Sequence, residues 1–279
     1  MAESTLVTDG KVESADGTEL AYRAWPAGAA SRVTFAVVHG LGEHAGRYER
    51  FADGMAKHGM GTYAVDLRGH GRSAGRRGHV DSWSQWIEDV EAFVSHVESI
   101  EEGEVVPVGH SFGGATLLST VLAGKVARSR RFVVSSPALK LKVAVPAWKL
   151  TLGPIASRIV PRLVLGNEVD PNTVSRIPEV VDAYRTDPLV HNKISARLGA
   201  EWQAASRTIL ARAGEIKIPF LILAGAADAL VDPAGSQELH QRAQAVSELH
   251  ILEGGYHEPF NDLGNEAVFH LIAEWLKKT

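Results

Sequence analysis

The sequence of 279 residues contains no cysteine, and this absence excludes several kinds of chemistry at once. A chain without thiols forms no disulfide bonds, has no cysteine nucleophile and holds no metal through thiolates. Because disulfides are rare in the reducing cytoplasm, their absence also fits a cytoplasmic protein, and this is the location that we expect.

Two further absences concern membranes. The first ten residues, MAESTLVTDG, lack a basic region followed by an apolar one, so the sequence shows no signal peptide. No apolar run approaches the ~20 residues that a helix needs to cross a bilayer. We therefore expect no secretion signal and no transmembrane segment.

The sequence also lacks an excess of positive charge, and it lacks phosphate-binding loops. The chain has 29 Lys and Arg against 33 Asp and Glu, a net charge of −4 that gives no basic footprint for nucleic acid. Neither a glycine-rich phosphate loop nor a dinucleotide fingerprint occurs. We expect no nucleic-acid partner, no cofactor and no metal.

What the sequence does contain is an alternation of short apolar runs with longer amphipathic segments. Residues 18–25 alternate in period two after the Asp16-Gly17 turn, which predicts a half-buried antiparallel strand. Residues 81–100 carry apolar side chains at three- and four-residue spacing behind an Asp or Ser cap, which predicts a helix. Six further runs are continuously apolar, as strands buried on both faces are: 33–40, 61–69, 104–111, 131–137, 219–225 and 248–255. This alternation predicts an α/β fold with a mostly parallel, doubly wound sheet.

The alternation lapses between about residues 138 and 207. This segment contains six of the twelve prolines (Pro146, Pro154, Pro161, Pro171, Pro178 and Pro188), together with apolar helical pieces and no convincing buried strand. We interpret it as a helical insertion. The predicted division is therefore a core formed by residues 1–137 and 208–279, with the insertion at 138–207.

Residues 109–113 form the pattern G-x-S-x-G around Ser111, between a predicted strand and a helix-compatible segment. This context is the one that a nucleophile elbow needs. The sharp turn strains the serine backbone, and it leaves no space for side chains at the flanking Gly109 and Gly113. The N-terminus of the following helix favours negative charge near the hydroxyl. The pattern predicts Ser111 as a nucleophile rather than as an incidental serine in a glycine-rich turn.

A serine nucleophile needs a base and a group that orients the base, in the chain order Ser, acid, His. Asp228 lies just beyond the end of a predicted strand, where catalytic groups of open α/β sheets gather, and is the preferred acid. Asp232 is the rival, but it precedes Pro233 and suits a helix cap. His257 follows the last predicted strand in a loop and is the expected base. The other histidines after Asp228 lie within predicted elements: His240, His250 and His270.

The oxyanion of an acyl-transfer intermediate needs backbone donors beside the serine. A predicted strand ends before His39-Gly40-Leu41, and the turn that follows can direct a backbone N–H toward the surroundings of Ser111. The residue after the nucleophile, Phe112, supplies the second donor. The predicted oxyanion hole therefore consists of the N–H groups of Leu41 and Phe112.

Two clusters of polar residues invite comparison with ligand sites. The first is Glu43, His44 and Arg47, which lack a third well-spaced metal ligand, so a structural hydrogen-bond network is the preferred interpretation over a metal or acidic-ligand site. The second is Asp66, Arg68 and His70, interpreted in the same way as groups that fix a loop.

These motifs together resemble the monoacylglycerol lipase and lysophospholipase branch of the α/β-hydrolases, from about residue 15 to the end of the chain. The similarity is carried by His39-Gly40-Leu41-Gly42-Glu43-His44 with Gly46-Arg47-Tyr48, by residues 66–73 (DLRGHGRS), by the serine elbow, by the Asp228 and His257 segments, and by Asp187-Pro188-Leu189. The resemblance implies the α/β-hydrolase fold with a helical cap insertion. Leu41 and Phe112 are bulkier than the residues common in this family, which implies an acyl pocket of different shape.

In this family the insertion forms a cap that carries an apolar acyl channel and, in some members, docks on lipid surfaces, so the resemblance implies a protein that can also bind at the periphery of membranes. Its apolar residues are Val143, Val145, Trp148, Leu150, Leu152, Ile155, Ile159 and Leu163, flanked by Lys140, Lys142 and Lys149. We expect most of them to pack on the core and a few exposed ones to suit contact with lipid.

The expected activity is hydrolysis of monoacylglycerols, small lipid esters, to fatty acid and glycerol through an acyl-enzyme. A general carboxylesterase or lysophospholipase would use the same three residues and remains an alternative. A non-catalytic binding protein on this fold is disfavoured because serine, aspartate and histidine are all present.

Overall fold

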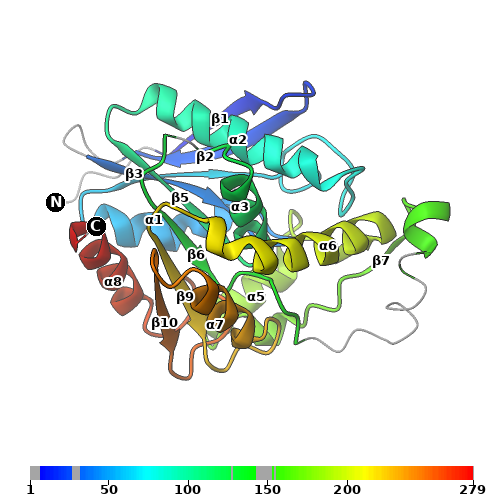
Figure 1. The fold of residues 1–279 in the computed structure, drawn as a ribbon. Coiled ribbons are helices and arrows are strands. Elements are labelled where there is room, and N and C mark those ends of the chain that lie inside the picture. Colours follow the sequence, from blue (N-terminus) through cyan, green and yellow to red (C-terminus); the bar gives the residue numbers. More distant parts are fainter. Residues whose placement is uncertain (1–6, 27–31, 127, 143–152, 154, 279) are drawn as a thin grey trace.

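The computed structural model describes residues 7–26, 32–126, 128–142, 153 and 155–278. Within this part of the chain, eight strands form one sheet in the order β1-β2-β4-β3-β5-β6-β9-β10 (Figure 1). They are β1 (Thr8–Glu13), β2 (Glu19–Trp25), β3 (Val33–Val38), β4 (Gly61–Val65), β5 (Glu104–His110), β6 (Phe132–Ser135), β9 (Phe220–Gly225) and β10 (Ser247–Leu252). From β4 to β10 neighbouring strands are parallel, whereas β2 pairs antiparallel with both β1 and β4. The predicted mostly parallel sheet is confirmed.

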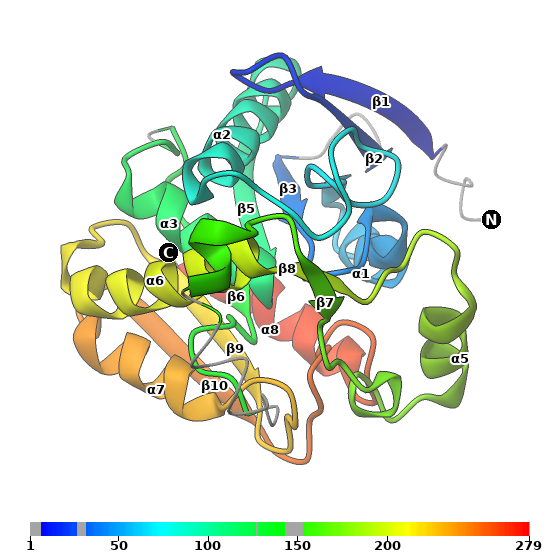
Figure 2. The same cartoon turned by 90° about the vertical axis from the view of Figure 1, so that its right-hand side faces the viewer.

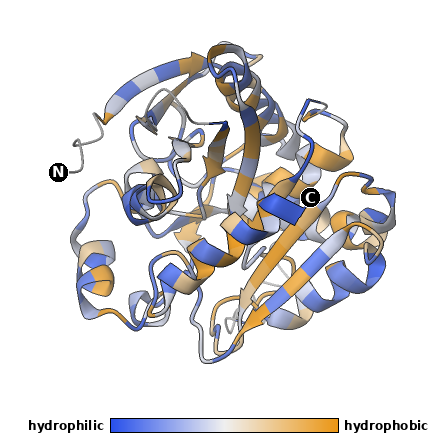
Figure 3. Ribbon diagram, turned by 90° about the vertical axis from the view of Figure 1, so that its left-hand side faces the viewer, coloured by the Kyte–Doolittle hydropathy of each residue, from blue (hydrophilic) through white to orange (hydrophobic). Residues whose placement is uncertain are grey.

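Helices cover both faces of the sheet because the parallel strands carry apolar side chains on both. In β3, Phe35 and Val37 join one buried cluster, and Ala36 and Val38 join the other. The first cluster includes side chains of α1 (Glu49–Ala56) and α8 (Asn265–Lys278); the second includes those of α2 (Trp83–Ile100), α3 (Phe112–Leu122) and α7 (Pro233–Arg242). Figure 3 shows the hydrophobic central strands behind helices with hydrophilic outer faces.

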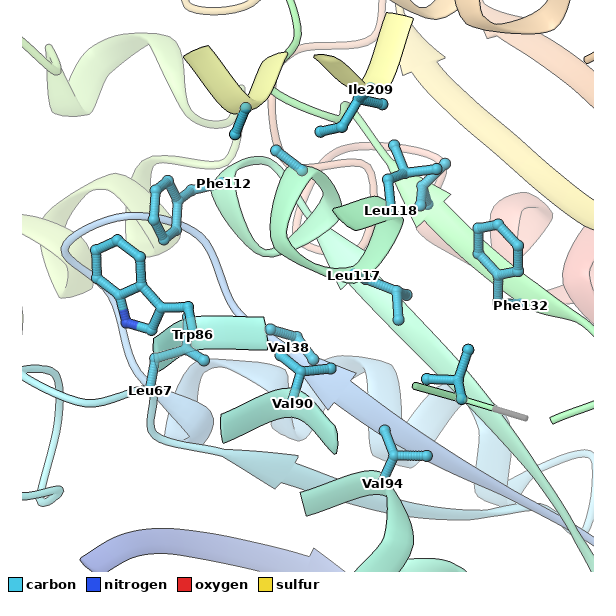
Figure 4. Packing of buried hydrophobic residues seen from close by; sticks show 14 of the residues in the cluster. Val38, Leu67, Trp86, Val90, Val94, Phe112, Leu117, Leu118, Phe132 and Ile209 are labelled. Atoms are coloured by element: carbon cyan, nitrogen blue, oxygen red, sulfur yellow. The ribbon is translucent and has the colours of Figure 1, made fainter. Parts of the chain in front are cut away.

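The α2–α3 face shows how the sequence pattern becomes packing. The helix predicted at residues 81–100 is α2, and Ser82 caps it in a capping box with Gln85. Its apolar stripe, including Trp86, Val90 and Val94, packs against α3 and the sheet (Figure 4). Phe112 is fully buried there, edge-on to Trp86 at 4.8 Å between ring centroids.

Three strands were not predicted. The sequence of β1, Thr-Asp-Gly-Lys-Val-Glu, has no apolar alternation because it lies at the edge of the sheet with most side chains exposed. Within the insertion, β7 (Val164–Gly166) and β8 (Lys193–Ser195) form a separate two-stranded sheet. Strands of three residues are too short to show a period.

The insertion also contains η2 (Pro171–Thr173), α5 (Pro178–Thr186) and α6 (Ala196–Arg212). Figure 2 looks onto the side of the molecule that carries α5, β7 and β8. Helix α6 continues past residue 207, and the division of the chain at 138 and 207 stays a prediction. Among the described residues, no helix is both long and apolar enough to cross a membrane.

Only part of the predicted apolar cap surface falls in the described residues. Ile155, Ile159 and Leu163 are 55%, 74% and 46% exposed. Outside the described residues lie Val143, Val145, Trp148, Lys149, Leu150 and Leu152. Of the flanking lysines, Lys140 pairs with Glu238, and Lys142 donates to the backbone carbonyl of Asp228.

The sheet reverses its winding at β3. The chain leaves β3 for β4 on one side, and it returns to β5 on the other side. The loops after β3 and β5 therefore diverge and leave a crevice at the carboxyl ends of these strands, which is where open α/β sheets bind their ligands. Residues 39–44 and Ser111 follow directly after these two strands.

Candidate active site

Ser111 occupies the sharp turn between β5 and α3. Its backbone has φ 52° and ψ −117°, a conformation that L-residues rarely adopt. A Cβ at Gly109 would meet the carbonyl oxygen of Gly113 at 2.7 Å, and one at Gly113 would collide with the carbonyl oxygens of Val38 and His39. The crowding predicted from the sequence is therefore present, and it holds the serine at the start of α3.

A chain of two hydrogen bonds links the three predicted catalytic side chains. His257 Nε2 lies 2.9 Å from Ser111 Oγ, and His257 Nδ1 lies 2.7 Å from Asp228 Oδ2. Because an ionised carboxylate only accepts, Nδ1–H donates to Asp228, and Nε2 is left to accept the serine proton. The exposed fractions are 9% for Ser111, 6% for His257 and 2% for Asp228, so all three side chains are buried.

Asp228 and Asp232 have different surroundings. The second carboxylate oxygen of Asp228 accepts from the backbone N–H groups of Leu230 and Val231, at 2.8 and 2.9 Å. Burial disfavours the charged form, but His257 and these N–H groups outweigh it, so the pKa of Asp228 is lowered. Asp232 instead caps α7 by accepting from the N–H of Ala234. The structure thus brings Asp228 to the histidine and places Asp232 in the helix-capping position expected for it.

The electrostatic surroundings of His257 favour its protonated form. Burial on its own would lower the pKa of this imidazole, but the Asp228 carboxylate overcomes that effect and the pKa is raised. Glu258 and Glu43 act in the same direction as Asp228. A base in these surroundings takes a proton readily, which suits removal of the Ser111 proton.

The two predicted oxyanion donors belong to the loop after β3 and to the first residue of α3. Phe112 is the first residue of α3, so helix geometry leaves its N–H without an intrahelical acceptor. Leu41 lines the same cavity as Ser111, whereas the Phe112 ring is directed into the core. The bulk of Phe112 therefore contributes to packing, and only the bulk of Leu41 affects the shape of the pocket.

A buried ionic network supports both loops of the site. Glu43 Oε1 accepts from the N–H of Gly40 at 2.6 Å, which fixes the turn before Leu41. Arg47 donates to Glu43 Oε2 and to both oxygens of Glu258, each at 2.8 Å. Burial would raise the pKa of Glu43, but the Arg47 charge outweighs it and lowers this pKa to about 2. The network preferred from the sequence is present, and it extends to Glu258.

Sequence reasoning missed Glu258 and Tyr184 as parts of this network. Glu258 directly follows His257, and its backbone N–H donates to the carbonyl of Val174 in the insertion. The Arg47 guanidinium lies 4.6 Å from the centre of the Tyr184 ring, on α5. One arginine thus contacts the oxyanion loop, the histidine loop and the insertion. The adjacency of Glu258 to His257 was the only signal in the sequence.

The insertion also contacts the oxyanion loop directly. His44 Nε2 lies 2.9 Å from Asp187 Oδ2, and the N–H of His191 donates to the carbonyl of Gly42 at 2.8 Å. Asp66, one of the groups predicted to fix a loop, also holds this region, because its carboxylate accepts from the N–H of Ala45. Among the described residues, no group of three or more His, Cys, Asp or Glu side chains is arranged to hold a metal ion.

A cavity of about 670 Å³ opens above Ser111 between the core and the insertion. Most of its wall is apolar, with contributions from Leu139, Leu163, Leu165, Val169, Ile194 and Trp202. Polar groups, including Glu43, Tyr184 and Glu258, lie in the wall near His257. A cavity of this size and lining accommodates an apolar chain together with a small polar group.

Comparisons with known proteins agree with this architecture. The family described as serine aminopeptidase, S33, matches residues 29–264. A monoacylglycerol lipase of Mycolicibacterium smegmatis is 31% identical over 93% of this chain and 93% of its own length. An uncharacterized abhydrolase domain-containing protein of Dictyostelium discoideum is 32% identical over 95% of this chain, which spans 28% of that longer protein.

A solved structure agrees with these relatives. The monoacylglycerol lipase of Paleococcus ferrophilus is 32% identical and superposes with a TM-score of 0.81, over 97% of this chain and 98% of that one. The chain therefore belongs to the serine aminopeptidase, S33, family, within the monoacylglycerol lipase branch of the α/β-hydrolases, and it is a hydrolase of carboxylic esters.

Proposed function

We propose that this protein hydrolyses monoacylglycerols to fatty acid and glycerol through an acyl-enzyme formed on Ser111. The observation that carries the proposal is the hydrogen-bonded chain Ser111–His257–Asp228 at the base of an apolar cavity. A nucleophile, its base and the group that orients the base are the parts that ester hydrolysis through an acyl-enzyme requires.

In the first half of the reaction, Ser111 Oγ attacks the ester carbonyl while its proton passes to His257 Nε2. The carbonyl oxygen becomes an oxyanion, and the N–H groups of Leu41 and Phe112 stabilise it. Asp228 keeps the imidazole in the correct tautomer and stabilises the imidazolium. The tetrahedral intermediate collapses when His257 gives its proton to the departing alcohol oxygen, which releases glycerol.

In the second half, water replaces the alcohol. His257 takes a proton from the water as it attacks the acyl carbonyl, and the same two backbone donors hold the second oxyanion. Collapse returns the proton to Ser111 and releases the fatty acid. Each half uses the histidine once as a base and once as an acid, so no further group is needed.

The cavity supports a substrate with one long acyl chain. Each methylene that moves from water to the apolar wall contributes about 0.8 kcal/mol. Contacts that also hold the carbonyl in line with Ser111 raise turnover as well as binding. Medium- and long-chain monoacylglycerols should therefore have higher kcat/KM than acetyl or propionyl esters. Triacylglycerols should be poor substrates because three chains do not fit one channel.

Contact with lipid aggregates forms part of the proposal. Ile155, Ile159 and Val160 are exposed at the surface of the insertion, and Arg158 and Arg162 interleave with them in the sequence. An apolar surface with basic residues beside it suits the interface of a lipid droplet or membrane. This supports delivery of the substrate from such a surface into the cavity below.

The experiment is a substrate profile with the purified protein. Glycerol monoesters from two to eighteen carbons, lysophosphatidylcholine, an alkyl ester series and an aminoacyl anilide would be compared by kcat/KM, with Ser111→Ala as the background control. The proposal expects a maximum at eight or more carbons among the glycerol monoesters. A maximum at two to four carbons would indicate a general carboxylesterase. Preference for lysophosphatidylcholine, or cleavage of the anilide alone, would contradict the proposed substrate.

A further inference from the structure

The insertion and the oxyanion loop, residues 39–44, are in direct backbone contact at Gly42, the residue after Leu41. The N–H of His191 donates to the carbonyl of Gly42 at 2.8 Å. A Cβ added to Gly42 would lie 2.3 Å from the carbonyl oxygen of His191, so the two backbones pack with no space for a side chain between them. A displacement of His191 would therefore be transmitted to Gly42 and to the neighbouring Leu41.

The His191 side chain is itself fixed by two hydrogen bonds. Its Nε2 lies 3.2 Å from the carbonyl oxygen of Gly69, in the loop between β4 and α2, and its Nδ1 lies 3.2 Å from the backbone nitrogen of Lys193. Because a carbonyl only accepts and a backbone N–H only donates, the imidazole is neutral and carries its proton on Nε2. The side chain thus ties residue 191 to a loop of the core and to its own segment.

The ring also takes part in a chain of contacts among three imidazoles. The centroid of the His70 ring lies 4.7 Å from that of His191 and 5.0 Å from that of His39, and His70 is fully buried. His39 is the first residue of the oxyanion loop. Its Nδ1–H donates to the carbonyl of Gly40, and its Nε2 accepts from the N–H of Leu67. His191 is therefore connected to the loop twice, by its backbone and through the chain of rings.

The surroundings of these imidazoles favour their neutral form. Burial lowers the pKa of His191 to about 4, and the charge of Arg77 acts in the same direction. The pKa values of His39 and His70 are also lowered, in both cases mainly by burial. At neutral pH an uncharged substitute for His191 therefore changes no charge near Ser111, so any effect on catalysis comes from position.

We propose that His191 is a positioning residue, which holds Gly42 so that the N–H of Leu41 points at the forming oxyanion. This inference rests on the proposed function, in which that N–H is one of the two oxyanion donors. His191 is not among the residues that line the cavity above Ser111, so it acts through the loop and not on the substrate. Its contribution should therefore appear in the transition state, where the oxyanion forms, and not in the binding of the acyl chain.

Three substitutions of His191 separate its contacts. His191→Ala removes both side-chain hydrogen bonds and the ring contact. His191→Asn keeps an acceptor near the position of Nδ1 but has no donor that reaches Gly69, whereas His191→Gln extends an amide NH₂ to the position of Nε2 and keeps that donor. Asn192→Ala is the matched control, since Asn192 is the next residue and its side chain is exposed.

The test measures kcat and KM for glycerol monooctanoate, together with the affinity for two inhibitors that share one alkyl chain. Heptyl trifluoromethyl ketone mimics the tetrahedral intermediate: Ser111 Oγ adds to its carbonyl carbon, the hydroxyl proton passes to His257, and the carbonyl oxygen becomes an oxyanion. The corresponding secondary alcohol fills the cavity but forms no oxyanion. Both affinities are measured by competition with fluorophosphonate labelling, which does not depend on ester turnover, and circular dichroism checks that each variant is folded.

For His191→Ala and His191→Asn we expect kcat to fall about 10-fold, less than the roughly 10²- to 10³-fold lost when an oxyanion donor is removed outright, with KM changed by less than about 2-fold. The affinity for the ketone should fall by about the same factor as kcat/KM, while the affinity for the alcohol is unchanged. His191→Gln and Asn192→Ala should retain kcat within about 2-fold of the wild-type value.

An unchanged kcat in folded His191→Ala and His191→Asn would overturn the inference. An equal loss of affinity for the ketone and the alcohol would also overturn it, because His191 would then shape the cavity and not the oxyanion loop. A wild-type protein that binds the ketone more tightly than the alcohol but does not hydrolyse glycerol monooctanoate would refute the proposed function instead, so the two failures are distinguishable.

Discussion

The backbone of Ser111 shows what a single residue contributes to the site. A positive φ is unfavourable for serine, yet the hydrogen bond from its N–H to the carbonyl of Ser135 and the packing of Gly109 and Gly113 impose it. The packing of β5 and α3 offsets the strain. The resulting conformation keeps Ser111 Oγ 2.9 Å from His257 Nε2.

The two candidate acids provide a test at the residue scale. Asp228→Asn should lower kcat by about 10⁴, because the amide donates to His257 Nδ1 and so favours the tautomer that cannot accept the serine proton. Asp232→Asn should lower it far less, since asparagine caps a helix as well as aspartate does. The measurement is kcat on one monoacylglycerol for both variants, with circular dichroism to check folding. A larger loss at Asp232 would reverse the assignment.

At the scale of the element, the loops at the ends of the parallel strands are coupled through Arg47. Burying an ion pair removes both charges from water, which opposes the attraction between them. Removing one partner leaves the other charge buried and unpaired, and this destabilises a protein by about 3–5 kcal/mol. The arginine therefore fixes the oxyanion loop and the histidine loop relative to each other through Glu43 and Glu258. The one positive charge of Arg47 does not balance the two carboxylates of Glu43 and Glu258, so the network has a net negative charge beside His257.

This charge predicts a shift in the pH profile. His257 must be neutral to act as a base, so kcat/KM falls as the pH drops through its pKa, which is raised above 6.5. Glu258 raises that pKa, and Glu258→Gln should therefore move the acid limb to lower pH. His110 stays neutral in this range because burial, with His257 nearby, lowers its pKa to about 4.

The control for this shift is Glu253→Gln. Glu253 is an exposed carboxylate on the same loop. Its substitution should leave the acid limb in place, which separates a local charge effect from a general one. An acid limb that stays fixed in Glu258→Gln, in a protein that still folds, would show that Glu258 serves only to hold the loop.

The exposed surface of the insertion gives a second prediction for an element. Ile159 is 74% exposed, so Ile159→Ser should not disturb the core. Full burial of such a side chain in lipid contributes about 1.5–3 kcal/mol, so activity on dispersed long-chain monoacylglycerol should fall on the order of tenfold, while a dissolved short-chain ester is unaffected. Ile100→Ser, at the exposed end of α2, is the control. Equal activity of both variants on the lipid dispersion would exclude Ile159 from lipid contact.

At the scale of the whole molecule, the periodicity of the sequence predicted most of the sheet. Strands such as β5 and β9 are buried on both faces, so their apolar runs stand out against the helices between them. The edge strand β1 could not be predicted because its residues are polar, and β7 and β8 are too short. A hydrophobic pattern reveals a strand only where enough of its side chains are buried on the same face or faces.

The residues of the candidate site also fall into those that the sequence predicts and those that it does not. Ser111, Asp228 and His257 could be predicted because a nucleophile elbow has a local signature and its partners follow strand ends in a known chain order. Glu258 and Tyr184 could not, because their roles depend on contacts between distant parts of the chain. Arg47, for example, reaches Glu258 across 211 positions. Such contacts follow from the tertiary fold and leave no local pattern.

The central claim is that one serine carries out the hydrolysis of monoacylglycerol. The most direct measurement titrates the protein with a fluorophosphonate, and it follows the labelled fraction by intact mass and the remaining hydrolysis of glycerol monooctanoate in the same samples. The account predicts one label per chain, located on Ser111 by peptide mapping, with activity falling in proportion to labelling. Ser111→Ala should take no label and show no activity above background. Full activity in protein labelled at Ser111, or wild-type hydrolysis by Ser111→Ala, would contradict it.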